Sequence, residues 1–458
     1  MKAIPFRVKL AYGSAEFSVS IVFTTISIFF LFFLTEVVGI SPAAGSMVLS
    51  VAVLWDAFSD PIMGIVSDRT PGRYGRRRPY ILASAVPYGV IFWLLFVVPP
   101  LRGNMLIAYY MFVALLMHTA MTILDVPYTA MAAEMTRDYD ERTSLVSYRV
   151  ICGSVGTLLV ASVFYYAVEQ FDDPKTGWSV ASSVVGLICL FPILYMWHGT
   201  RGWEHQAGDA EPLTVRDVSE AVFRNRTFRY VLGLFLFSIS AVYASGTMAM
   251  YFLEYLMQFT EGQISVYWFV LFLMMALWVP VITFLANRIG KRGAFILLMA
   301  VWAAGFGVGA MLVRPGMTVM MYLLAILASI GGIATYQLGW AMIADVVEVD
   351  EFKTGRRREG LYYGVCNFAM KLGSALALFL VGQLLELIGY EPGMVQSAST
   401  ILGLRVIFGP LLASIIIVSI VIAYFMPMTR AKHKALIEAI EAKRAAQSWN
   451  EEAIKDLL

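Results

Sequence analysis

The sequence predicts an all-α membrane protein with twelve transmembrane helices in two pseudo-symmetric six-helix bundles. Three observations support this prediction: the chain is more apolar than a soluble protein, its basic residues alternate between loops, and motifs of the first half recur in the second. Of its 458 residues, 59% are hydrophobic and 14% are charged, whereas soluble domains are about half apolar and a quarter charged. Lipid must therefore be the main solvent of this chain.

Twelve apolar runs are each long enough to cross a bilayer, which takes about 20 helical residues. We expect the spans at 11–35, 43–67, 80–100, 104–134, 144–168, 177–198, 229–259, 263–287, 293–313, 317–345, 361–388 and 401–426. Beyond them, the charged tail places Leu436, Ile437 and Ile440 at helical spacing. This pattern predicts a cytoplasmic amphipathic helix.

Lysine and arginine are enriched in cytoplasmic loops, so their distribution indicates orientation. With the N-terminus inside, 28 of the 34 basic residues fall in cytoplasmic segments and four fall outside. The remaining two, Arg149 and Lys371, lie within spans. A wrong number of helices would destroy this bias, so the sequence predicts twelve spans with both termini cytoplasmic.

An internal repeat relates each helix of the first half to the helix six positions later. The loop at 64–78 after span two is matched at 287–292 after span eight, and Ala-Met-Ala-Ala-Glu at 130–134 is matched by Ala-Met-Ile-Ala-Asp at 341–345. Parallel repeats of this kind move around a midplane site in alternating access. The predicted domains are an N-terminal bundle at 1–198, a cytoplasmic linker at 199–228, a C-terminal bundle at 229–428 and a cytoplasmic tail at 429–458.

Two acidic residues in span two are the most informative charges in the chain. Asp56 and Asp60 lie one helical turn apart, with Ser59 between them and Pro61 directly after. Such carboxylates are costly in a membrane and repel each other, so a hard cation such as Na⁺, or a shared proton, is expected between them. The alternative is that both carboxylates pair with basic residues of neighbouring helices.

Further charges lie within other spans. Asp125 is in span four, Arg149 in span five and Lys371 in span eleven, with Asn367 one turn before the lysine. Three buried carboxylates and two buried cations leave a net charge of −1 for a transported cation to cancel. This balance favours coupling of a solute to an ion, although a structural ion pair would also explain the two cations. Tyr336 in span ten is a candidate solute contact.

The loops between spans two and three and between spans four and five share a pattern of acidic and basic residues. Salt bridges in these loops could close the cytoplasmic side in one state and break in the other. The alternative is that the basic loop at 68–78 only reflects the enrichment of basic residues in cytoplasmic loops. The candidate gate residues are Asp68, Arg69, Arg77, Arg137, Arg142 and, in the second half, Arg288.

These motifs carry a resemblance to known transporters. The paired Gly-x-x-x-Asp-Arg and Gly-Arg-Arg-Arg loops resemble the signature of the major facilitator superfamily. Four segments, at 9–13, 55–64, 125–128 and 371–375, resemble the glycoside–pentoside–hexuronide:cation symporter family, which includes melibiose permease. The resemblance implies coupling to sodium, lithium or protons, with Asp56, Asp60 and Thr122 at the cation. It also implies that Asp125 and Arg149 contact the solute and that Lys371 links the two sites.

The sequence departs from the melibiose permease pattern where that protein holds its sugar. Val19 and Ser20 replace a lysine and a sugar-binding aspartate, Thr129 replaces a tryptophan next to Tyr128, and Tyr336 replaces a second tryptophan. The cation half of the pattern is intact and the galactoside half is not. The expected solute site therefore comprises Asp125, Arg149, Lys371, Ser20, Tyr128, Thr129, Tyr336 and Asn367.

Together these features predict a secondary transporter of the cell membrane that carries a sugar, glycoside or sugar acid with Na⁺ or H⁺. The alternative is a cation-coupled symporter or flippase for a lysolipid or another amphipathic solute. The sequence shows no nucleophile–base constellation and no catalytic domain, so we expect no enzymatic activity. We expect no cofactor other than the transported ion, no nucleic-acid partner, and a monomer in contact with lipid.

Overall fold

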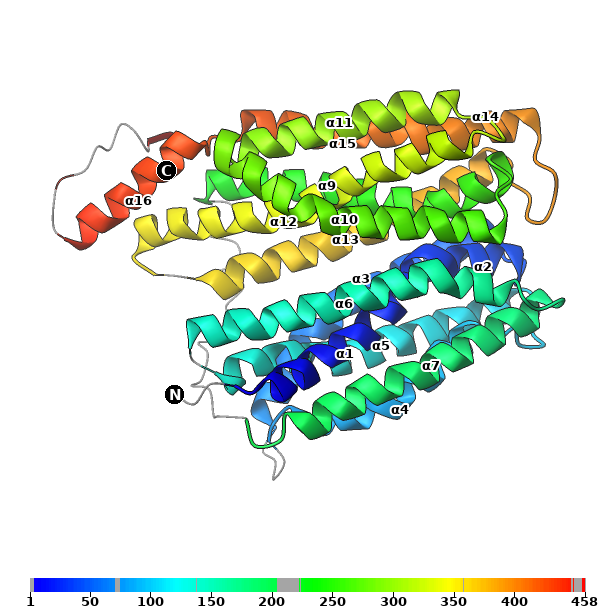
Figure 1. Ribbon diagram of the computed structural model, residues 1–458, viewed down its shortest axis with the longest axis horizontal. Coiled ribbons are helices and arrows are strands. Elements are labelled where there is room, and N and C mark those ends of the chain that lie inside the picture. Colours follow the sequence, from blue (N-terminus) through cyan, green and yellow to red (C-terminus); the bar gives the residue numbers. More distant parts are fainter. Residues whose placement is uncertain are drawn as a thin grey trace. The chain divides into compact units, whose positions relative to one another are not determined.

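Figure 1 shows a computed structural model that describes residues 4–70, 75–136, 138–203, 222, 224–356, 358–445, 448 and 455–457. Within these residues, twelve helical segments are long and apolar enough to cross a membrane. The predicted all-α fold and its twelve spans are thereby confirmed. The placement of both termini in the cytoplasm stays a prediction.

The first six spans agree with the predicted ranges to within a few residues. They are α1 (Phe6–Thr25) continued by η1 (Ile26–Phe30) and α2 (Leu31–Glu36), α3 (Pro42–Arg69), α4 (Arg78–Leu95), α5 (Asn104–Met135), α6 (Tyr139–Val168) and α7 (Pro174–Gly199). Capping side chains mark the starts of several of these helices. Ser41 and Asp173 each precede a proline, and the side chain of each accepts a hydrogen bond from a backbone N–H of the first turn. This bond satisfies one of the N–H groups that have no partner within the helix.

The last six spans follow the same pattern, and the tail helix comes after them. They are α9 (Arg226–Tyr251) with η2 (Phe252–Leu256), α10 (Glu261–Ile289), α11 (Lys291–Leu312), α12 (Thr318–Thr354), α13 (Glu359–Leu387), and α14 (Ala398–Val406) with η3 (Ile407–Leu411) and α15 (Leu412–Phe425). The tail forms α16 (Arg430–Arg444) and a short turn, η4 (Lys455–Leu457). The predicted tail helix is therefore present, and it buries Leu436 and Ile440.

Small residues allow some neighbouring helices to approach closely. In Figure 1, α1 runs beside α6 and α7, and α4 runs beside α5 and α7. A Cβ atom added at Gly13 would lie 2.8 Å from the backbone of Tyr148, and one at Gly89 would lie 2.5 Å from the carbonyl oxygen of Gly186. Helix pairs in membranes depend on such small residues for their packing.

By packing, the chain forms two compact units that do not follow the sequence repeat throughout. The first comprises Met1–Asp209, Gly246–Phe269 and Leu378–Thr400, and the second comprises Ala210–Ser245, Val270–Ala377 and Ile401–Leu458. Parts of α9, α10 and α13 thus pack with the first half of the chain. The predicted domain boundaries at 1–198 and 229–428, which rest on the repeat, stay predictions, and most of the predicted linker, 204–221 and 223, lies outside the described residues.

Candidate functional site

The acidic pair predicted from the sequence faces a hydroxyl group of α5. The Oγ1 atom of Thr122 lies 2.9 Å from Oδ1 of Asp56 and 3.0 Å from Oδ1 of Asp60. The Oγ atom of Ser59 lies 2.9 Å from the same threonine oxygen. The structure therefore brings all four predicted cation-site residues together, in the first packing unit.

The chemistry of this cluster is that of hard oxygen ligands. A hydroxyl has one proton and can donate it to one acceptor, so Thr122 cannot donate to both carboxylates at once. Nδ1 of His118 lies 3.8 Å from Oδ1 of Asp56, which places one imidazole at the edge of the cluster. A cation among these oxygens would relieve the repulsion between the carboxylates, because Na⁺-type ions bind carboxylate and hydroxyl oxygens.

Arg149 forms an ion pair with a residue of the first span. Its Nε atom lies 2.6 Å from Oε2 of Glu16, and its guanidinium lies 5.7 Å from the ring centroid of Tyr128. Glu16, on α1, is therefore an acidic partner of Arg149. The carboxylates of Glu16, Asp56, Asp60 and Asp125 and the guanidinium of Arg149 lie in this part of the first unit.

Several buried polar atoms near this pair find no hydrogen-bond partner among the described residues. Among them are Oδ1 of Asp125 and the hydroxyl of Tyr128. Buried polar atoms are nearly always hydrogen-bonded in folded proteins, so both are available to a bound molecule. The Tyr128 ring lies 5.0 Å from that of Tyr12.

Two other predicted solute residues are tied into the helix framework. The hydroxyl of Thr129 donates to the carbonyl oxygen of Val126 at 3.1 Å. Ser20 lies where α1 meets α6, since a Cβ atom at Gly153 would stand 2.8 Å from its Oγ atom. Neither residue supplies the negative charge that a sugar-binding aspartate would supply.

The remaining predicted solute residues belong to the second packing unit. Lys371 is half-buried on α13, and Asn367, one turn before it, is exposed. Tyr336 lies on α12 and shares a side-chain hydrogen bond with Tyr243 of α9. Nearby, Trp340 stacks on Tyr363 with ring centroids 5.7 Å apart.

A carboxylate network that the sequence did not predict joins distant segments of the first packing unit. Glu36, the last residue of α2, accepts hydrogen bonds from the hydroxyls of Tyr255 and Tyr390 and from the backbone N–H of Gly393, the last at 3.0 Å. The hydroxyls of Thr35 and Tyr251 lie 3.0 Å apart beside it. The start of the chain is therefore fastened to the segments around 255 and 390.

The tyrosines of this network remain hydrogen-bond donors. Burial, together with the neighbouring Glu36 carboxylate, raises the pKa of Tyr390 well above its usual range, so its hydroxyl keeps its proton and donates it. Hydrogen bonds to an ionised acceptor are stronger than neutral ones. On the predicted topology this network lies at the extracellular ends of the spans.

Charges at the opposite ends of the first-unit helices form a second cluster. Arg77 contacts Oδ1 of Asp68 at 2.6 Å and Oε1 of Glu134 at 3.4 Å, and Arg76 contacts the same oxygen of Glu134 at 2.6 Å. The predicted gate residues Asp68 and Arg77 thus meet, and Glu134 joins them.

The other predicted gate residues have separate positions. Arg142 lies 3.4 Å from the carbonyl oxygen of Thr136, and Arg69 is exposed. Arg137 lies outside the described residues. In the second unit, Arg288 lies over the ring of Phe284, 5.0 Å from its centroid.

The second half repeats the acid–base arrangement at matching positions. Gly75 and Gly290 both have positive φ angles, 84° and 83°, and the basic residue after each contacts the acid that ends the repeated pentapeptide. Arg76 contacts Glu134 at 2.6 Å, and Lys291 contacts Asp345 at 2.5 Å. The sequence repeat is therefore also a repeat of specific contacts.

Comparison with known proteins agrees with this architecture. A family model described as MFS/sugar transport protein matches residues 11–430. The chain is 29% identical to the uncharacterized symporter sll1374 of Synechocystis, covering 96% of this chain and 97% of that one. It is 26% identical to an Escherichia coli protein whose name proposes a sulfoquinovose importer, covering 97% and 96%. A bacterial homolog of the human lysosomal transporter Spinster, solved in an inward-facing and unoccupied conformation, has the same fold, with a TM-score of 0.70, 12% identity, and coverage of 98% and 99%.

Proposed function

The chain belongs to the MFS/sugar transport protein family and is a multi-pass transporter of the plasma membrane, and we propose that it couples symport of a sugar, glycoside or sugar acid to Na⁺ or H⁺. The observation that carries the coupling is the position of Thr122, whose hydroxyl lies within 3.0 Å of both carboxylates of the acidic pair. The arrangement is one that a transported cation would complete.

The chemistry next to the acidic pair supports a polar solute. Oδ1 of Asp125 and the hydroxyl of Tyr128, which have no hydrogen-bond partner among the described residues, offer an acceptor and a donor to a sugar hydroxyl. Arg149, held by Glu16, would add a cation for the acidic group of a sugar acid. A relative whose name proposes a sulfoquinovose importer is consistent with a sugar of negative charge.

We infer coupling from the short distances between the acidic pair and the Thr122 hydroxyl. A cation bound among these oxygens would be stabilised by the carboxylates, and its charge would in turn favour the ionised form of Asp125. A solute that hydrogen-bonds to Asp125 in its ionised form would then bind better when the cation is present. Linkage of this kind is reciprocal: each ligand raises the affinity of the other by the same factor.

The Glu36 network supports a role in alternating access. It fastens α2 to the segments around 255 and 390, which come from the other half of the sequence repeat. We propose that it closes the extracellular side in this conformation and must break when that side opens.

Uptake into proteoliposomes tests the proposal. Purified protein is reconstituted, and accumulation of radiolabelled neutral sugars, sugar acids and lysolipids is measured under an inward Na⁺ gradient, an inward proton gradient and no gradient. We expect accumulation of at least one sugar or sugar acid to depend on one of the gradients. Accumulation of lysolipid alone would support the amphipath alternative, and equal uptake with and without gradients would refute coupling.

Two variants separate the cation site from the fold. Asp60→Asn should abolish gradient-driven accumulation while leaving elution from a size-exclusion column unchanged. Asp172→Asn is the matched control, because Asp172 is exposed at the loop between α6 and α7 and its substitution should leave accumulation unchanged.

A further inference from the structure

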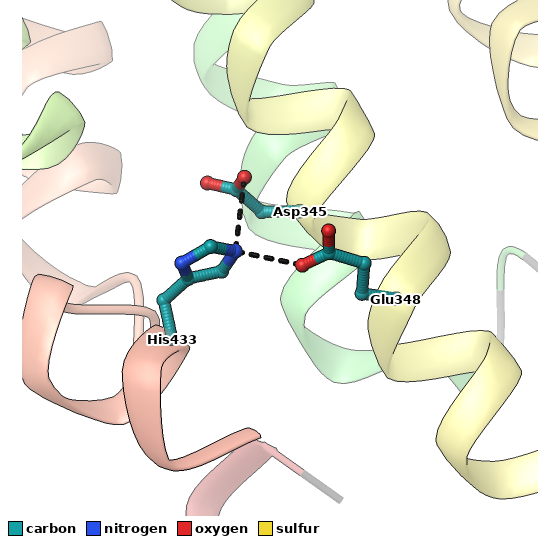
Figure 2. Close-up of side chains that lie close together, drawn as sticks. All are labelled: Asp345, Glu348 and His433. Carbon is teal, nitrogen blue, oxygen red and sulfur yellow. Dashed lines mark hydrogen bonds and ion pairs between the residues drawn. The ribbon is translucent and has the colours of Figure 1, made fainter. Parts of the chain in front are cut away.

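Three metal-ligating side chains meet where the tail helix contacts α12, in the second packing unit (Figure 2). Nε2 of His433 lies 2.7 Å from Oε2 of Glu348 and 3.4 Å from Oδ1 of Asp345. The three ligand atoms all lie within 4.8 Å of one another. This cluster is separate from the acidic pair and takes no part in the function proposed above.

The fold explains why these side chains converge. Asp345 and Glu348 are three residues apart on α12, which places them on one face of that helix. His433 is in the first turn of α16, whose start is capped by Thr429. Arg430 donates to the carbonyl oxygen of Arg288 at 3.0 Å, which holds that first turn against the end of α10.

A second contact fixes the other end of the tail helix. Nζ of Lys443 donates to the backbone carbonyl oxygen of Phe352 at 2.7 Å. The same ammonium lies over the phenyl ring of Phe352, 4.7 Å from the ring centroid. Because α16 is held near both ends, the direction of the His433 side chain toward α12 is set by the helix and does not depend on one flexible contact.

The set of ligands is one that zinc uses. Zinc binds imidazole nitrogen and carboxylate oxygen at about 2.0–2.2 Å, which places tetrahedral ligand atoms about 3.4 Å apart. The separation between His433 and Asp345 already has this value, and the separation between His433 and Glu348 would have to widen by about 0.7 Å. Neutral imidazole can donate one proton from Nε2, so it cannot satisfy both carboxylates, whereas a metal ion would bind all three groups.

The surroundings leave room for the rest of a coordination shell. A cavity of about 220 Å³ adjoins the cluster and is lined in part by Lys291, Arg292, Met342, Asp345, Thr429 and His433. Water in this cavity could complete the coordination of the metal.

Lys291 is the feature that limits the affinity. Its Nζ atom lies 2.5 Å from Oδ1 of Asp345 and 3.0 Å from the carbonyl oxygen of Ala341. The ammonium already neutralises one carboxylate and would repel a divalent cation. Removal of this charge should therefore strengthen metal binding, which a role of the cluster in hydrogen bonding alone would not predict.

We propose that Asp345, Glu348 and His433 form a binding site for Zn²⁺ or a similar divalent transition metal, and that the bound metal fastens the tail helix α16 to α12. The ligands come from two helices separated by 85 residues between Glu348 and His433. Metal binding would thus restrain the tail relative to a transmembrane helix.

Titration of the full-length protein, with any affinity tag removed, tests this site. Chelator-treated protein in nanodiscs is titrated with ZnCl₂ in a calorimeter, and the melting temperature is measured with and without Zn²⁺. We expect one Zn²⁺ per chain, an increase in melting temperature, and slower tryptic removal of the tail in the presence of Zn²⁺. MgCl₂ serves as a control cation and should have none of these effects.

Variants decide whether these residues are the ligands. His433→Gln retains a side chain that can donate to Glu348 and removes the imidazole, and Glu348→Gln removes a carboxylate; both should weaken Zn²⁺ binding at least tenfold. His198→Gln, at an exposed histidine of α7, is the matched control and should bind as the parent does. Lys291→Met should bind Zn²⁺ at least tenfold more tightly.

Two results would overturn the proposal. One is the absence of Zn²⁺ binding to both the parent and Lys291→Met. The other is Zn²⁺ binding and tail protection that survive unchanged in His433→Gln and Glu348→Gln, since the ion would then bind elsewhere.

Discussion

Glu36→Gln should open the side of the transporter that we propose the Glu36 network to close. The substitution keeps the size of the side chain and removes its charge. Tyr255, Tyr390 and Gly393 all donate to this carboxylate, so three charge-assisted hydrogen bonds become neutral or are lost.

The magnitude follows from those three bonds. A hydrogen bond to a charged group contributes about 1.5–3 kcal/mol and a neutral one about 0.5–1.5 kcal/mol. The loss is then about 1 kcal/mol per bond, or about 3 kcal/mol in total before solvent screening. Because Glu36 is half-buried, water screens part of this loss of hydrogen-bond free energy. We therefore expect the ratio of closed to open states to fall by at least about tenfold, which corresponds to about 1.4 kcal/mol.

Cysteine labelling measures this ratio. Ser46 is fully buried, and its hydroxyl lies 3.3 Å from the carbonyl oxygen of Phe379, so Ser46→Cys should react with a bulky maleimide only when this side opens. The experiment uses protein in nanodiscs, where both sides are accessible, with the three native cysteines replaced by alanine. Labelling should be at least tenfold faster in the Glu36→Gln background.

Glu391→Gln provides the control, since Glu391 is exposed in the same loop as Gly393 and its substitution removes the same charge without touching the network. Equal labelling rates in the parent, Glu36→Gln and Glu391→Gln would refute the reasoning. Faster labelling in both variants to the same extent would show that net charge matters and the hydrogen bonds do not.

Three further predictions concern the cation site, the solute site and the packing of the helices. Thr122→Val removes the hydroxyl shared by the two carboxylates, and should weaken Na⁺-dependent or proton-dependent stabilisation at least tenfold in thermal melts, with size-exclusion elution unchanged. Glu16→Gln leaves Arg149 without its ionised partner at 2.6 Å, and should weaken solute binding in calorimetry more than it lowers the melting temperature. Gly89→Ala places a Cβ atom 2.5 Å from a backbone oxygen, and should lower the free energy of unfolding by about 1–3 kcal/mol. Gly246→Ala is the control and should leave that free energy unchanged, because a Cβ atom there would have no atom of a neighbouring helix within 4 Å among the described residues.

The fold was predictable because the signals that define it are local. Each span is a contiguous apolar run, and bilayer thickness sets its minimum length, so predicted and observed boundaries differ by a few residues at most ends. The exception is α12, which continues to Thr354, nine residues beyond the predicted end of the apolar run at 345. Its last turns carry charged residues, and a helix can continue past the hydrocarbon boundary once water and neighbouring side chains satisfy those charges.

The acidic pair was predictable for the same reason. Asp56 and Asp60 are one turn apart on one helix, so their proximity follows from sequence spacing alone. The partner of Arg149 was not predictable in this way: Glu16 lies 133 residues earlier in the chain. No sequence signal names a partner for Arg149, and only the packing of α1 on α6 brings Glu16 to it.

The Glu36 network shows what sequence reasoning misses. Glu36 ends an apolar run, where a charge is expected at a membrane interface and needs no further explanation. Its partners lie 219 and 354 residues away, and tyrosines near span ends are also common as interface anchors. Each residue alone has an ordinary explanation, and the function proposed for them depends on their combination.

The two halves of the chain carry the same contact at matching positions, but in the second half it is extended. Arg76–Glu134 and Lys291–Asp345 each join the base after a positive-φ glycine to the acid near a helix end. Asp345 also lies near His433 of the tail, which is outside the repeat. A restraint on the tail would therefore act first on α12, the helix that carries Tyr336. Glu134, at the matching position of α5, pairs with basic residues of its own half, so the restraint would limit the movement of α12 more than that of its counterpart α5.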